Sequence, residues 1–111
     1  MNLLKDFQKT KNILFIKIQS FPIPIIAAIN GFSMGGGFEL ALSCDIRICC
    51  ENSLFIQSEK GGKTLSFIVA KRLSKLIGSG KAKKILLAIE KINVEEALKI
   101  GLITNSYPLK E

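Results

Sequence analysis

The spacing of apolar and polar positions predicts a helical start followed by a strand-rich segment. Residues 3–18 carry apolar side chains among lysines, with the spacing of an amphipathic helix, although the run ILFIKI at 13–18 also suits a strand. Two prolines, Pro22 and Pro24, prevent this helix from continuing. Residues 25–29 are continuously apolar, which is typical of a short strand buried on both faces.

The next segment alternates between turns and short elements. Asn30-Gly31 predicts a turn, and the run from Gly36 to Ser43 predicts a short helix whose first turn is glycine. Two further strands are expected at 45–50 and 54–56, separated by the turn residues ENS.

The second half of the chain has helical periodicity. We predict helices at 65–78, 81–91 and 94–101, and a closing strand within 102–108. The order strand, helix, strand, strand and then helices indicates an α/β or α+β layer arrangement. No internal repeat or linker is apparent, so residues 1–111 are expected to form a single domain.

Composition narrows the class of protein. With 48% hydrophobic and 23% charged residues the chain has ordinary globular composition, which argues against disorder. Lysines and Arg47 interrupt every apolar run before it reaches the roughly 18 residues of a membrane span. The first residues lack the pattern of a signal peptide, so we expect a cytoplasmic protein without a membrane partner.

Histidine and cysteine usage limits the chemistry. The chain has no histidine, which excludes Ser-His-Asp and Cys-His nucleophile systems and nearly all zinc chemistry. The three cysteines, Cys44, Cys49 and Cys50, form no CxxC pair and are expected to be buried reduced thiols. Acid–base work therefore falls to Asp, Glu, Lys, Tyr or Cys, and no metal site is expected.

The net charge of +7 comes mostly from lysines spread along the chain, most densely at Lys81, Lys83 and Lys84. Scattered lysine is usually a solvated surface. A phosphate-bearing ligand is the second interpretation. Nucleic acid ranks last, because one tyrosine and no tryptophan offer little surface for base stacking.

Two segments imitate part of a phosphate-binding loop. QSEKGGKT at 57–64 ends like the pattern GxxxxGK[ST], but Gln57 stands where the backbone needs glycine to curl around phosphate. SGKA at 79–82 lacks both the distal glycine and the hydroxyl. Nucleotide binding is therefore a rival function that these motifs support only weakly.

The glycine triplet Gly35–Gly37 suggests a site. Glycines between a strand and a helix allow close approach to a ligand and leave amide N–H groups at a positive helix end, as in an oxyanion hole. Glu39 in the first turn and Glu59 after a later strand add two candidate acid–base carboxylates. Structural interpretations stay open: the glycines permit tight packing, Glu39 complements the helix dipole, and Glu59 is a solvated loop residue.

The run PIIAAINGFSMGGGFELALSCDIRI at 24–48 closely resembles the signature of the enoyl-CoA hydratase/isomerase (crotonase) superfamily. The similarity continues more loosely through LFIQSE and again over residues 71–103. The resemblance implies an α/β crotonase-like spiral fold with short strands packed against helices, of which residues 1–111 form a partial domain.

The resemblance also implies an activity on acyl thioesters. Gly36 supplies an oxyanion-hole N–H, and Glu39 and Glu59 are the catalytic carboxylates: in a hydratase they hold water and exchange protons, whereas an isomerase needs a single acting carboxylate. No metal or redox cofactor is implied, and coenzyme A enters as part of the substrate. Substrate contact is assigned to the neighbouring positions Met34, Gly35 and Gly37.

Three departures from the family pattern shape the expectation. Family members have a longer preceding segment that supplies the other oxyanion N–H, a different loop after the second carboxylate, and C-terminal trimerisation helices. We therefore expect weak or no turnover from the isolated chain unless a homo-oligomer or another chain completes it. The alternative is a non-catalytic remnant or assembly subunit that binds acyl-CoA or a partner chain. A carrier-protein-tethered acyl chain is a further substrate option.

Overall fold

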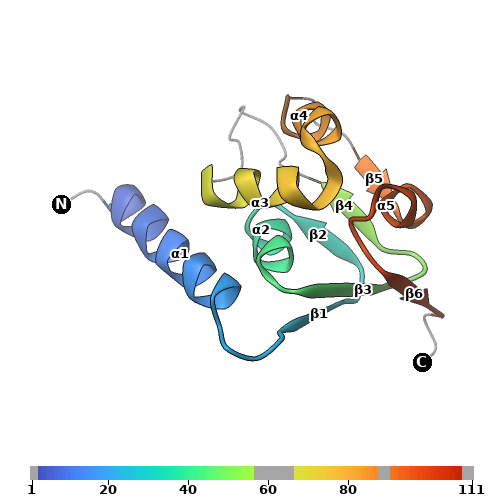
Figure 1. Ribbon diagram of the computed structural model, residues 1–111, viewed down its shortest axis with the longest axis horizontal. Helices are drawn as coiled ribbons and strands as arrows, with labels where there is room; N and C mark the ends of the chain where they lie inside the picture. The colour runs from blue at the N-terminus through green and yellow to red at the C-terminus, as the bar shows by residue number, and fades with distance from the viewer. Residues whose placement is uncertain (1–2, 57–66, 88–90, 109–111) are drawn as a thin grey trace.

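The computed structural model describes residues 3–56, 67–87 and 91–108 (Figure 1). Five helices and six strands lie in these ranges, and they alternate along the chain as an α/β protein does. Their order is α1 (Leu3–Gln19), β1 (Ile26–Ile29), β2 (Phe32–Met34), α2 (Gly36–Ser43), β3 (Ile46–Cys50), β4 (Leu54–Ile56), α3 (Phe67–Ile77), α4 (Ser79–Leu87), β5 (Lys91–Asn93), α5 (Val94–Ile100) and β6 (Asn105–Tyr107).

The strands form two three-stranded sheets. β1, β3 and β6 are parallel neighbours in that order, whereas β2 is parallel to β4 and β4 is antiparallel to β5. The chain passes from the first sheet to the second at the turn around Gly31, whose φ of 123° favours glycine. Buried Ser53 joins this turn to the one between β3 and β4, since its hydroxyl accepts from the Gly31 N–H at 3.4 Å.

α2 lies near the centre of the molecule, with α1 to one side and α3 above it (Figure 1). Phe38 of α2 and Phe55 of β4 are both almost fully buried, with ring centroids 6.2 Å apart. This core fixes α2 from several sides, which matters because its first turn carries the candidate site. The largest fully buried apolar side chains are Phe15, Phe38, Phe55, Leu42, Leu73, Leu102 and Val69. No helix in the described ranges is long and apolar enough to cross a membrane.

Most predicted elements are confirmed. The first segment is helical throughout, which rules out a strand at 13–18, and α2, β3 and β4 match their expected ranges to within one residue. The three cysteines are free and buried, as expected.

Three expectations fail for tertiary reasons. β1 is not buried on both faces: it is the edge strand of its sheet, and Ile26 is 58% exposed. The short strand β2 was not expected, because residues 32–34 lie between the predicted turn and the predicted helix and no element was predicted there. The helix expected to reach residue 91 does not, because Lys91–Asn93 pairs with β4 as β5.

The buried cysteines yield a prediction about thiol reactivity. Burial raises the pKa of the Cys44 and Cys49 thiols above their ordinary value, and at Cys44 the nearby charges of Arg47 and Arg72 offset only part of this rise. Only the thiolate reacts with iodoacetamide. Alkylation of both residues in the folded chain should therefore begin at a higher pH than alkylation of a free cysteine, whose pKa is about 8.5. Peptide mass spectrometry across a pH series measures this, with the urea-unfolded chain as control. Equal pH profiles in the two states would contradict it.

Candidate active site

The glycine triplet joins β2 to α2 through a sharp bend. Gly35 has φ 55° and ψ −122°, a conformation in which a side chain is strained. Its N–H donates to the Ile56 carbonyl at 3.3 Å, and its carbonyl accepts the Glu39 N–H at 3.0 Å. The Gly35 amide is therefore used inside the fold, and this residue shapes the bend instead of serving as the oxyanion donor.

Gly36 and Gly37 form the exposed first turn of α2. A helix leaves its first amide N–H groups without intrahelical partners, and the Gly35 N-cap supplies no side-chain hydrogen bond to them. A Cβ built on either glycine meets no described atom within 4 Å. The turn thus presents bare backbone at the positive end of a helix, which is what a developing oxyanion requires.

Glu39 lies in that first turn but is directed into the protein. Its side chain is only 4% exposed, and Oε1 lies 2.8 Å from the Nζ of Lys11 on α1. The Lys11 ammonium also lies 5.8 Å from the centre of the Phe7 ring, one helical turn earlier. A carboxylate removed from water needs such a partner, because an unpaired buried charge is costly.

Sequence reasoning missed Lys11. The apolar pattern of residues 3–18 does not identify the inward face of the first helix, because Phe7 and Leu14 are exposed whereas Phe15 is buried. The contact with Glu39 and a side-chain exposure of only 20% show that Lys11 faces inward, as does Phe15 one turn later. The sequence carries no signal for this contact, because the inward position of Lys11 is visible only in the structure and its partner lies 28 residues away.

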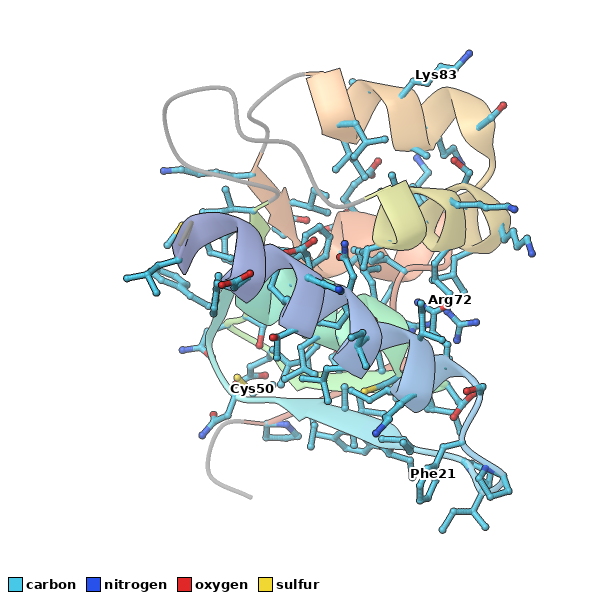
Figure 2. All side chains as sticks on the ribbon, turned by 90° about the vertical axis from the view of Figure 1, so that its left-hand side faces the viewer. Phe21, Cys50, Arg72 and Lys83 are labelled. Carbon is cyan, nitrogen blue, oxygen red and sulfur yellow. The ribbon has the colours of Figure 1, made fainter. Side chains whose placement is uncertain are left out.

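The opposite end of α2 is fixed by two arginines that do not belong to the helix. Arg47 of β3 is buried and donates to the carbonyls of Cys44 at 2.7 Å and Ala41 at 3.3 Å. Arg72 of α3, placed at the end of α2 (Figure 2), donates to the carbonyls of Leu42 and Cys44. The cations complement the negative end of the helix dipole, while Glu39 occupies the positive end.

Burial lowers the pKa of the Arg47 guanidinium, and the charge of Arg72 lowers it further. Several carbonyl acceptors offset this cost. The amino-acid pattern does not indicate this arrangement, because it shows only that Arg47 interrupts an apolar run.

The remaining predicted site residues are placed as follows. Met34 ends β2 beside the glycine triplet and is 36% exposed, so it is accessible to a ligand. Glu59 lies outside the described residues, as does the segment 57–64 that resembles a phosphate loop. Lys83 extends from α4 into solvent (Figure 2), in line with a solvated lysine surface.

A separate hollow of about 430 Å³ lies at the carboxyl ends of β1 and β3. Its lining includes Ile29, Asn30, Cys49 and Tyr107, and none of the predicted site residues. It is therefore separate from the turn that carries Glu39.

Comparison with known proteins supports the resemblance along the whole chain. The family model described as enoyl-CoA hydratase/isomerase matches residues 2–111. The chain is 46% identical over 93 residues to a short-chain-enoyl-CoA hydratase of Clostridium acetobutylicum, covering 83% of this chain and 36% of that protein. It is 43% identical over 100 residues to a crotonyl-CoA hydratase of Syntrophomonas wolfei, covering 89% of this chain and 38% of that protein.

Solved structures share the fold. An enoyl-CoA hydratase from Bacillus anthracis superposes with a TM-score of 0.84 at 30% identity, covering 99% of this chain and 44% of that one. An enoyl-CoA isomerase from M. smegmatis gives a TM-score of 0.78 at 34% identity, covering 90% of this chain and 47% of that one. This chain therefore spans less than half the length of these relatives. The crotonase-type α/β fold is confirmed, and the chain belongs to the enoyl-CoA hydratase/isomerase family.

Proposed function

We propose that this chain acts on enoyl thioesters of coenzyme A, with the Gly36 N–H as an oxyanion donor and Glu39 as a proton carrier. The observation that carries the proposal is the first turn of α2. This turn contains both the exposed backbone of Gly36 and Gly37, which a ligand can approach closely, and the buried carboxylate of Glu39. Relatives named as hydratases and as an isomerase support the same substrate class.

The chemistry follows from charge development on the thioester carbonyl. In hydration, the water oxygen bonds to the β-carbon, the double-bond electron pair moves toward the carbonyl oxygen, and a carboxylate takes the water proton. The enolate, stabilised by the Gly36 N–H, then receives a proton at the α-carbon. Glu39 and Glu59 would share these transfers. In isomerisation, Glu39 alone removes a proton from one carbon and returns it to another.

The proposal includes slow turnover by residues 1–111 alone. An oxyanion hole uses more than one donor, and losing one costs about a hundredfold or more in rate. Among the residues that the structure describes, we assign only Gly36 to this role. Addition of a polypeptide that supplies a second donor should therefore raise the rate.

The assay follows the conjugated double bond by ultraviolet absorbance. Hydration of crotonyl-CoA removes this absorbance, whereas isomerisation of a 3-enoyl-CoA creates it, so one instrument distinguishes the two reactions. Parallel reactions with the acyl-carrier-protein thioester test the carrier-tethered substrate. Absence of both reactions at high enzyme concentration, together with absence of acyl-CoA binding, would overturn the proposal.

Substitution of Gly36 by Ala tests the need for bare backbone. The added methyl group meets no described atom within 4 Å, and Gly36 is not at positive φ, so the fold should tolerate it. Helix propensity favours alanine by about 1 kcal/mol. We therefore expect unchanged or higher stability together with a large loss of turnover, measured by urea unfolding and the absorbance assay.

Gly80→Ala is the matched control, because Gly80 is also exposed in the first turn of a helix, α4, and a Cβ added there has open space. It should leave turnover unchanged. Equal turnover in Gly36→Ala and wild type would show that the thioester does not approach this turn.

The second candidate function is assembly without catalysis. β1 and β2 are edge strands of the two sheets, with Ile26 58% and Phe32 74% exposed. Unpaired edges with apolar side chains favour association with another chain. Sedimentation of the purified chain tests this function, and a stable monomer without apolar self-association would contradict it.

A further inference from the structure

We propose that Lys11 is a positioning residue for Glu39: from α1, its ammonium orients the Glu39 carboxylate beside the glycine turn. The inference deepens the proposed function and rests on it for its catalytic part. Its physical part, the ion pair across two helices, rests on geometry alone.

The geometry of the pair is that of a partly buried, charge-assisted hydrogen bond. Nζ and Oε1 are 2.8 Å apart, and the two side chains are 20% and 4% exposed. At such burial the attraction is screened less than on an open surface. Glu39 is the more buried partner of the pair.

Neighbouring contacts restrict Lys11 itself. The Phe7 ring lies one turn toward the N-terminus, 5.8 Å from the ammonium. One turn toward the C-terminus, Phe15 is 2% exposed and anchors α1 in the core. The ammonium therefore lies near one aromatic ring, and α1 packs against α2, which bears its partner.

This arrangement gives Lys11 a role that an ordinary structural lysine lacks. By engaging Oε1, it constrains the rotation of the carboxylate that must reach the substrate. Effective proton transfer requires the carboxylate within hydrogen-bond distance of the reacting atom, and a misplacement of about 1 Å costs about a hundredfold in rate. We therefore expect Lys11→Met to lower kcat by about a hundredfold while KM changes little.

Two further variants make the kinetic test specific. Lys11→Arg keeps the cation and should restore much of kcat, whereas a packing defect would not distinguish arginine from methionine in this way. Lys9→Met changes an exposed lysine on the same helix and should behave as wild type. A wild-type kcat in Lys11→Met, or failure of Lys11→Arg to recover activity in a folded chain, overturns the positioning role.

A double-mutant cycle tests the ion pair without relying on turnover. Lys11→Met should lower the urea midpoint because it removes the ammonium that lies 2.8 Å from a buried carboxylate, and adding Glu39→Gln should recover most of that loss. An equal loss in both backgrounds overturns the pair. Turnover that is insensitive to Glu39→Gln contradicts the proposed function instead. If the Lys11→Met variant has wild-type turnover and the Glu39→Gln variant has none, only the role of Lys11 is overturned.

Discussion

Replacing Glu39 by Gln is expected to lower the turnover of enoyl thioesters by about 10²–10⁴-fold, the contribution typical of a positioned acid–base group. Glutamine keeps the size and polarity of the side chain but neither carries nor accepts a mobile proton. The residue is buried, so the substitution also removes a charge that the protein must otherwise compensate. We therefore expect little loss of stability. The absorbance assay and urea unfolding measure the two effects on the same protein.

Glu95→Gln is the matched control for this experiment. Glu95 is also a carboxylate in the first turn of a helix, α5, but it is exposed and has no place in the proposed site. If Glu39 only complemented a helix dipole, both substitutions would have small and similar effects on turnover. Equal turnover in the two variants would therefore refute the catalytic role of Glu39 and favour the structural interpretation.

Arg47→Met should produce the largest loss of stability that we predict. The guanidinium joins the end of α2 to the segment after α5, since Nε donates to the Leu102 carbonyl at 2.7 Å and Nη1 to the Cys44 carbonyl at 2.7 Å. Removing the donors leaves buried carbonyl groups short of partners, at a cost of about 3 kcal/mol or more. The total free energy of unfolding of a protein domain is only about 5–15 kcal/mol. Urea unfolding measures the change.

Arg72→Met serves as the comparison for Arg47. Arg72 donates to carbonyls of the same helix end, but it is 24% exposed, so water can replace part of what is lost. We expect a clearly smaller shift of the urea midpoint. Equal shifts of the urea midpoint in the two variants would show that the greater burial of Arg47 does not increase its contribution to stability.

Long-range contacts explain what sequence reasoning missed. Lys11 and Glu39 are 28 residues apart, and Arg47 and Leu102 are 55 apart. Periodicity reports only which side of an element is apolar, not which element covers it. The edge position of β1 was not predicted for the same reason: an apolar run does not show how many neighbouring strands pair with it.

The sequence by itself determined the bend at the glycine triplet, the helix that follows it, and the family. A glycine triplet before an amphipathic stretch predicts a tight bend into a helix, and α2 begins and ends where expected because those preferences act between near neighbours. Only the tertiary structure decided that Glu39 turns inward, that its partner is Lys11 of α1, and that two arginines hold the far end of the helix. The physical reason is electrostatic: a buried charge is tolerated only where a distant part of the chain brings a counter-charge or hydrogen-bond acceptors to it.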